Sequence, residues 1–450
     1  MTAAPAAEQA SARGHGVARH PVQVDVDGDF TLDDLLALPE VGPARRINAA
    51  PATLAELWQL HAADHAEPTA GTHGGTVAMQ DTPTEADAVL LHRIEASGLF
   101  RPPVRAQVAA LTPDLGTTWL ALAARWVDLS QSCGDLRFLN TACKLTGAIW
   151  LHHNRSDGVG REPNLTSQVA AVGRLLGEAT DRLRRRLADR IVLAEPAGPS
   201  DEALCPGRLA GESQARIAVL AGSGSRSTGR LVTAATTAGL PIQTVCWYTP
   251  PQTGPAASSN YSSAWYPPAP PDHSASPSLP SNVPTTTAES WDDVAAAIRA
   301  ADADVVLLVG MPVVPDHVLG AARLGVLNAH NGALPTHRGM DAVGWAILNN
   351  QPVVCSLHVA RPIVDTGEVI AAHPVPITPA HTLAARVKST QLRLLLAGAA
   401  HVAATGTLPD LTPQTAAGTQ FYRLHPHLKR LLDASPYALD DNPQWTVTQP

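Results

Sequence analysis

Apolar residues in the first half of the chain recur at intervals of three and four positions. This spacing places them on one face of an α-helix and is typical of amphipathic helices. The predicted helices span residues 53–65, 86–97, 117–130, 136–152 and 167–188. Residues 1–24 are rich in alanine without such a pattern, so we expect a disordered tail there. The pattern therefore predicts an all-α domain over residues 25–200, whose role the sequence does not assign.

The pattern changes after residues 201–214, a Pro- and Gly-containing stretch that we interpret as an interdomain linker. From there, short apolar runs of strand length alternate with helix-like segments. The strand-like runs cover residues 216–221, 242–248, 304–309, 324–327 and 353–359. The helix-like segments cover residues 229–238, 291–301, 315–322 and 381–406. Such alternation indicates βαβ units, so we predict an α/β fold with an open, mostly parallel, Rossmann-like sheet over residues 215–425.

Two further segments of this half lack a core-forming pattern. Residues 249–290 are rich in Pro, Ser, Thr and Ala, a composition that cannot pack a core, and we predict a long loop. Residues 426–450 are expected to form a C-terminal tail.

Composition excludes several classes of protein. The 450 residues include 32 Lys and Arg against 40 Asp and Glu, a net charge of -8. We therefore expect no nucleic acid as the main partner, because neutralising phosphates requires a basic face. No run approaches the roughly 18 apolar residues of a membrane span. The N-terminal stretch also lacks the apolar run of a secretory signal, so we expect none. We expect a cytoplasmic protein that acts on small molecules, with formation of a homo-oligomer left open.

The five cysteines are widely spaced and none forms a CxxC pair. Structural zinc sites and disulfide frameworks need closely spaced or paired cysteines. The sequence therefore predicts neither of them, and no metal site.

A turn rich in glycine and serine follows the strand predicted over residues 216–221. It precedes a helix, so its backbone N–H groups and the helix dipole could receive an anion. Ser227 stands where a dinucleotide-binding fingerprint has its third glycine, and no acidic residue follows about 20 residues later. Both departures disfavour a nicotinamide or flavin site. An ordinary tight turn and a turn that contacts a substrate phosphate or carboxylate both remain open.

Polar residues that could take part in a reaction follow the strand predicted over residues 324–327. Because side chains alternate along extended backbone, Asn328 and His330 should point the same way just beyond the strand end. Open α/β sheets bind ligands at that edge. An amide offers two donors and an acceptor, and an imidazole titrates near neutrality, which suits a carbonyl carbon that becomes tetrahedral and anionic. Asp365 follows the next strand in an Asp-Thr-Gly turn, where it could alternatively form a local Asx turn.

Together these residues resemble the formyltetrahydrofolate-dependent formyltransferases. That family includes glycinamide ribonucleotide transformylase, methionyl-tRNA formyltransferase and the sugar N-formyltransferases. Its Asn-x-His, then a small-residue-Leu-Pro loop, then Arg-Gly, then Asp-x-Gly all occur here in order. The helix predicted over residues 381–406 and the Gly-Thr-Gln-Phe-Tyr at 418–422 are similar to the family's closing segment. The resemblance covers residues 215–425.

The resemblance implies N10-formyltetrahydrofolate as the cofactor and catalytic roles for Asn328, His330 and Asp365. Asn328 and a protonated His330 would stabilise the developing oxyanion, while Asp365 would keep His330 charged and help move the proton of the amine. His358 falls where the family often has a histidine and is a secondary candidate. The implied cofactor-binding residues are Gly310, Met311, Pro312, Val313, Val314, Gly332, Ala333, Leu334, Pro335, Val364 and Thr366. The implied substrate-binding residues are Gly222, Ser223, Gly224, Ser225 and Arg338.

The sequence departs from the family in three places. Asn331 and Gly332 follow His330, where the family usually has Pro or Gly followed by Ser. The loop 249–290 is longer than the family norm, and we expect it to cover the acceptor site. Too few residues follow Tyr422 for the barrel with which methionyl-tRNA formyltransferases hold tRNA, so tRNA is not the expected acceptor.

Three functions fit these features. The leading hypothesis is an N-formyltransferase for a small amine, such as an amino sugar nucleotide, an amino acid or hydroxamate precursor, or a natural-product intermediate. The helical domain would then help to bind the acceptor or build an oligomer. The second is a formyltetrahydrofolate hydrolase, which uses water as the acceptor, and the third is a catalytically silent folate-binding or scaffold module. The intact Asn328, His330 and Asp365 favour the enzymes over the third.

Overall fold

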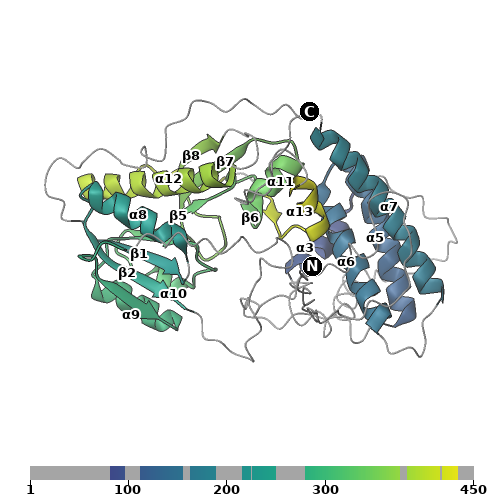
Figure 1. Cartoon of the computed structure of the whole chain (residues 1–450), viewed down its shortest axis with the longest axis horizontal. Helices are drawn as coiled ribbons and strands as arrows, with labels where there is room; N and C mark the ends of the chain where they lie inside the picture. Colours follow the sequence, from purple (N-terminus) through teal and green to yellow (C-terminus); the bar gives the residue numbers. More distant parts are fainter. Residues whose placement is uncertain are drawn as a thin grey trace, which may run out of the picture.

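The computed structural model describes the two regions that the sequence separates. It covers residues 82–96, 112–155, 163–188, 215–223, 225–249, 279–375, 383–415 and 418–433. The predicted N-terminal tail, the helix over residues 53–65, the linker and most of the loop 249–290 lie outside the described residues, as does Gly224. In Figure 1 the helices of the first half stand at one end of the molecule and the sheet stands at the other.

Within the described residues of the first region, four helices correspond to four of the five predicted ones. They are α3 (Glu85–Ala96), α5 (Pro113–Cys133), α6 (Leu136–Arg155) and α7 (Pro163–Ala188). The Thr112 hydroxyl caps α5 by accepting from the Leu115 N–H, and Gly134 ends that helix with a positive φ of 76°. Large apolar side chains, Trp119 and Trp126 among them, are fully buried between the helices. This burial is what the helical spacing of the apolar residues predicts.

The second region is built on a seven-stranded sheet in the order β3-β2-β1-β4-β5-β7-β8. The five parallel strands are β1 (Ile217–Gly222), β2 (Ile242–Tyr248), β3 (Thr285–Ala288), β4 (Val305–Val309) and β5 (Gly325–His330). The antiparallel strands β7 (Val353–Val359) and β8 (Val369–Val375) extend the edge beyond β5. The prediction of an open, mostly parallel α/β sheet is therefore confirmed.

Helices cover both faces of this sheet (Figure 1). They are α8 (Arg226–Thr237), α9 (Trp291–Ala300), α10 (Asp316–Leu319) and α12 (Leu383–Thr405). Successive residues of β1 belong to different clusters of buried side chains, since Val219 packs on the side of α8 and α12 and Leu220 on the side of α9. Because neighbouring side chains of a strand point to opposite faces, both faces of the central strands are apolar.

Several elements differ from the expectations. β3 lies within the segment predicted as a loop, because its sequence Thr-Thr-Thr-Ala is an edge strand with exposed threonines and gives no apolar signal. β8 is an edge strand whose side chains are half-buried or exposed except at Val375, and the sequence pattern did not predict it. β5 continues through His330, so the two candidate residues lie inside the strand rather than beyond it, because β7 pairs with them. α10 is shorter than the predicted 315–322.

The prediction that residues 426–450 form a tail is also partly wrong. Its first residues form α13 (Pro426–Asp433), a short helix that buries Leu428, Leu431 and Leu432. An additional helix, α11 (Ala342–Leu348), and a two-stranded parallel sheet of β6 (Arg338–Gly339) and β9 (Gln420–Phe421) lie near it. α11 and α13 stand between the large sheet and the first four helices (Figure 1).

One cluster of buried apolar residues joins the helical region to the second region. It combines side chains of α3, α5, α6 and α7 with those of α11, α13, β7 and Phe421. Burial of apolar area is the main favourable contribution to folding, so this shared core ties the two regions together. None of the helices in the described ranges has the length and hydropathy of a membrane span.

Candidate active site

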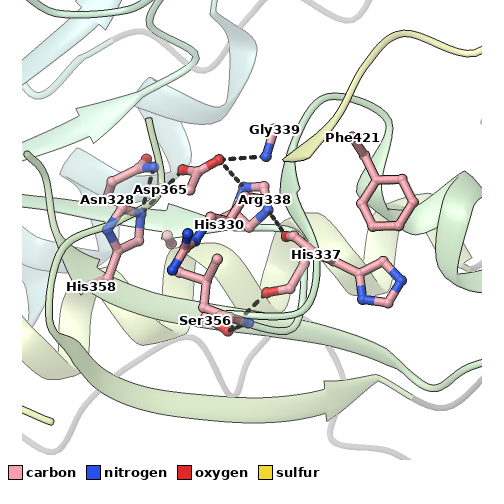
Figure 2. A network of polar contacts seen from close by, with 12 residues as sticks. Asn328, His330, His337, Arg338, Gly339, Ser356, His358, Asp365 and Phe421 are labelled. Carbon is pink, nitrogen blue, oxygen red and sulfur yellow. Dashed lines mark hydrogen bonds and ion pairs between the residues drawn. The ribbon is translucent and has the colours of Figure 1, made fainter. Parts of the chain in front are cut away.

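The paired strands β5 and β7 place four polar side chains on one face of the sheet. Their antiparallel register sets Asn328 opposite His358 and His330 opposite Ser356. Directly opposite residues on one face lie within contact distance of each other. Figure 2 shows Asn328, His330 and His358 gathered beside Asp365, with the Asn328 Nδ2 atom 3.1 Å from His358 Nε2. The structure therefore brings together the three residues predicted to be catalytic, and adds His358.

Asp365 reaches this cluster through a tight turn after β7. Its φ is 57°, in the left-handed region that non-glycine residues rarely adopt. Gly367 passes so close to the Val359 carbonyl that a Cβ atom would collide with it, so only glycine fits there. The side-chain amide of Gln414 donates to the carbonyls of Asp365 (3.0 Å) and Gly367 (2.6 Å). These contacts fix the turn and aim the Asp365 side chain inward.

The Asp365 carboxylate lies between two histidines and is 7% exposed. Oδ2 is 3.4 Å from His330 Nδ1, and Oδ1 is 3.4 Å from His358 Nε2. Oδ2 also accepts a hydrogen bond of 2.8 Å from the Gly339 N–H. Burial by itself would raise the pKa of Asp365, but His358, His330 and the Gly339 N–H outweigh it and hold the pKa below its usual value. Asp365 is therefore ionised at neutral pH.

His330 has an acceptor at each ring nitrogen. Nδ1 faces Asp365, and Nε2 lies 2.8 Å from the His337 carbonyl oxygen. Burial is the largest influence and lowers the pKa of His330, although Asp365 and the carbonyl oppose it. The ring is therefore mainly neutral at neutral pH. This direction differs from the expectation that Asp365 keeps His330 protonated, which did not account for how deeply β7 and the following loop bury the ring.

The loop after His330 is held by a residue that the sequence did not single out. The Ser356 hydroxyl donates to the Gly332 carbonyl (2.8 Å) and accepts from the Leu334 N–H (3.2 Å). Gly332 packs against both His330 and the His337 carbonyl, where a Cβ atom would clash. The Leu334–Pro335 peptide bond is cis. No spacing rule points to Ser356, because its role arises only when β7 lies beside the loop.

The predicted cofactor and substrate residues fall into separate groups. The turn after β1 and the turn after β4 touch, since a Cβ atom on Gly222 would lie 2.7 Å from the Gly310 carbonyl oxygen. This brings part of the predicted substrate turn beside the first of the predicted cofactor residues. Val313 in that loop is 53% exposed, and Ile363 in the Asp365 turn is 71% exposed. Both are large apolar side chains available to a ligand.

A second group lines a cavity of about 340 Å³. Leu334 and Pro335 form one side of it. The other residues are Val369, Ile370, Ala371, Ala372, Thr412, Pro413, Gln414 and Thr415. Of the predicted cofactor residues, only Leu334 and Pro335 line this cavity. It therefore lies beside the loop 332–335 and away from the turn after β4.

Arg338 is engaged within the protein. Its Nε and Nη2 atoms donate to the Gln414 side-chain oxygen at 3.1 and 2.8 Å. Gln414 thus links Arg338 to the Asp365 turn, a role that no motif of the sequence indicates. The contact of Arg338 with a substrate stays a prediction. Among the described residues, no group of His, Cys, Asp or Glu has the arrangement of a metal site.

Comparisons with known proteins support the resemblance seen in the motifs. Residues 215–396 match the family model described as formyl transferase. The methionyl-tRNA formyltransferase of Deinococcus radiodurans is 34% identical over 127 residues, which are 27% of this chain and 38% of that protein. That of Sorangium cellulosum is 35% identical over 118 residues, 24% of this chain and 38% of that protein. The predicted resemblance to formyltransferases is confirmed for this segment, while the chain spans little more than a third of these relatives' length.

Solved structures of low sequence identity also align with the chain. Glycinamide ribonucleotide transformylase 1 from Symbiobacterium toebii is 21% identical with a TM-score of 0.32, covering 44% of this chain and 94% of that one.

Proposed function

We propose that the chain transfers a formyl group from N10-formyltetrahydrofolate to the amine of a small molecule. One observation carries the proposal: an ionised, buried Asp365 between His330 and His358, with Asn328 alongside. The cluster lies in a segment that matches the formyl transferase family model. Nucleophile activation, charge stabilisation and proton transfer are the three tasks of this reaction, and the four side chains can share them.

Asn328 would stabilise the negative charge that develops on the formyl oxygen. A side-chain amide has two N–H donors, and one of them is used toward His358 at 3.1 Å. Asn328 is half-buried, whereas the two histidines and Asp365 are buried. Its second N–H is therefore the donor of the cluster best placed to meet a substrate oxygen. A donor fixed before the reaction contributes more than a water molecule that must reorient.

His330 would accept the proton that the amine loses on attack. Its lowered pKa leaves the ring neutral and able to act as a base. Once protonated, the ring would donate from both nitrogens, to Asp365 and to the His337 carbonyl. Asp365 and the His337 carbonyl do not raise the pKa of His330 enough to offset burial, but they would stabilise the imidazolium once it forms. The same proton could then pass to the nitrogen that leaves the formyl carbon.

The residues around the cluster fit a folate. When bound, it would supply the formyl carbon. The loop of Gly310 to Val314, with Val364 and Thr366, and the loop of Gly332 to Pro335 would hold it. Exposed apolar side chains such as Val313, set beside a few convergent polar groups, are typical of small-molecule sites. Gly222 and Ser225 adjoin Gly310, and we propose that they face the acceptor together with Ser223.

The test is turnover of the purified chain with N10-formyltetrahydrofolate and a panel of amines. Tetrahydrofolate release is followed by absorbance, and mass spectrometry seeks a product heavier by one CO. The variants His330→Ala and Asp365→Ala are compared with His373→Ala, an exposed histidine on β8 that serves as the control. We expect amine-dependent release that the first two substitutions abolish and the third leaves intact.

The other outcomes distinguish the remaining hypotheses. Release of formate without any amine would indicate a hydrolase. Binding of the cofactor without turnover would favour a scaffold, and absence of binding would contradict the proposal.

A further inference from the structure

We infer that the helical region is a positioning unit for the candidate active site. Its buried polar cluster of Glu95, Asn140, Thr141 and Lys144 fixes the C-terminal segment 418–425, which in turn fixes β6. β6 holds Asp365 and is preceded by the carbonyl that faces His330. The catalytic consequence of this inference rests on the proposed function, but the mechanical coupling does not.

The cluster is buried between α3 and α6. The Glu95 carboxylate accepts from Asn140 Nδ2 (3.1 Å) and Thr141 Oγ (2.6 Å), and it forms an ion pair with Lys144. Glu95 and Lys144 are 5% exposed, and Asn140 is 1% exposed. Breaking a buried pair by removing one partner is strongly destabilising, so the side chains have little freedom.

Asn140 transmits this rigidity to the C-terminal segment. Its Nδ2 atom donates to the Arg423 carbonyl (3.2 Å), and its Oδ1 atom accepts from the His425 N–H (2.6 Å). One side chain of α6 therefore satisfies backbone groups two residues apart, more than 280 positions later in the sequence. A buried backbone group that loses its partner is costly, which locks the segment onto the helical region.

The C-terminal segment then holds β6. β9 pairs with β6, and hydrogen bonds of 3.0 Å run from Arg338 N–H to the Thr419 carbonyl and from Met340 N–H to the Phe421 carbonyl. The Leu424 N–H donates to Asp341 at 2.9 Å. Every residue from 338 to 341 except Gly339 is thus tied to the segment by a direct hydrogen bond.

Aromatic contacts support the same connection. The Phe421 ring stacks on the His337 ring, with centroids 4.9 Å apart and planes at 11°, as Figure 2 shows. The guanidinium of Arg137, a residue of α6, lies over the Phe421 ring, 5.9 Å from its centroid. The Tyr422 hydroxyl meets His92 of α3 at 2.6 Å.

β6 and His337, the residue before it, each contact the catalytic cluster. The Gly339 N–H, the exception above, donates to Asp365 Oδ2 (2.8 Å), and the His337 carbonyl faces His330 Nε2 (2.8 Å). A shift of β6 would therefore change both the orientation of Asp365 and the environment of His330. Displacements of about 1 Å in a catalytic group can reduce the rate by about 100-fold.

Asn140→Ala tests the coupling, and Asp87→Asn is the matched control. Asp87 is also buried on α3 and also bridges to a neighbouring helix, through Arg125 (2.7 Å) and Trp126 (3.1 Å) of α5. It makes no contact with segment 418–425 among the interactions of the described residues. Both variants are made in the full chain and compared at a temperature at which circular dichroism shows them folded.

The first measurement is hydrogen–deuterium exchange of residues 337–341. We expect Asn140→Ala to speed exchange of the Gly339 and Met340 amides at least about tenfold, because local opening follows the loss of their support. Asp87→Asn should leave these amides at the wild-type rate. Unchanged exchange in Asn140→Ala, or equal acceleration in both variants, would overturn the inference. This readout does not depend on any enzymatic activity.

The second measurement is steady-state formyl transfer with the acceptor found for the wild type. We expect Asn140→Ala to lower kcat about tenfold or more while KM for the folate changes little, since β6 orients catalytic groups rather than the folate loops. Asp87→Asn should keep the wild-type kcat. Wild-type kcat in Asn140→Ala would overturn the catalytic part of the inference. A wild-type protein without turnover would instead refute the proposed function, and exchange alone would decide the coupling.

Discussion

Two buried carboxylates of this molecule have opposite kinds of partner. Glu95 accepts from an amide and a hydroxyl and is paired with the Lys144 ammonium; burial lowers the pKa of Lys144, and Glu95 opposes that shift. Asp365 accepts one backbone N–H and otherwise faces two imidazoles, each 3.4 Å away. The comparison suggests how to distinguish a structural cluster from a chemical one. The first surrounds its carboxylate with two hydrogen bonds and an ion pair, and the second leaves it 3.4 Å from two imidazoles that can gain or lose a proton.

Asp365→Asn should give the largest effect, because it removes the charge that both histidines face. We expect kcat to fall by roughly 10³-fold, at the level of a lost proton-transfer partner. The amide can still accept from the Gly339 N–H, so the thermal midpoint should change little. Steady-state kinetics and a melting curve on the same sample provide the check. A loss of folding in step with the loss of activity would place Asp365 in the same structural class as Glu95.

Lys144→Met tests the other side of the comparison. It leaves the Glu95 carboxylate buried without its ammonium partner, and we expect the free energy of unfolding to fall by about 3–5 kcal/mol. The control is the double variant Lys144→Met with Glu95→Gln, which removes the charge and keeps an oxygen for Thr141 and Asn140. We expect the double variant to recover most of the loss in a urea titration. No recovery would mean that Lys144 acts through packing rather than through the ion pair.

Asn328→Ser separates charge stabilisation from proton transfer. Loss of one preorganised donor lowers kcat by about 10²-fold in comparable sites, so the effect should be smaller than that of Asp365→Asn. Asn328 is the half-buried member of the cluster, and its removal should cost little stability. A kcat within about twofold of the wild type would contradict the assignment of the oxyanion donor to Asn328.

The sequence predicts the members of the candidate site better than their electrostatic state. Alternation along β5 puts Asn328 and His330 on one side, and the Asp-Thr-Gly turn brings Asp365 to them, both of which are local properties. Ser356 and Gln414 hold the loop and the turn from distant positions in the chain, so no spacing could identify them. The direction of the pKa shift of His330 depends on burial, which is set by the tertiary packing of several segments.

The same reasoning explains which elements of the fold were missed. The central strands are apolar on both faces and give a clear signal. β3 and β8 are edge strands with few buried side chains, and their pairing depends on a neighbour that is already in place. α13 is short, and its three leucines are buried only because they pack into the core shared by the two regions. Periodicity therefore predicts the centre of the sheet, while its edges and the contact between the regions need the tertiary structure.

The pH dependence of the reaction gives the smallest and most discriminating effect. Burial lowers the pKa of His330, and the neutral ring is the proposed base. The rate kcat/KM should therefore hold steady near neutral pH and fall about tenfold per unit only below a pKa that lies under the usual 6.5 of histidine. Asp365 raises the pKa of His330, so Asp365→Asn should move this acid limb to still lower pH.

The profile is measured as kcat/KM from pH 5 to 8 for the wild type and Asp365→Asn, with the residual activity of the variant. An acid limb above 6.5 in the wild type would mean that Asp365 overcomes burial and raises the pKa of His330. A rate that instead falls as the pH rises through the pKa of His330 would mean that His330 works protonated, as the sequence alone suggested. An unmoved limb in the variant would mean that the titrating group is not His330. Since His358 faces the same carboxylate, a matched profile of His358→Gln would then show whether the second imidazole carries the proton.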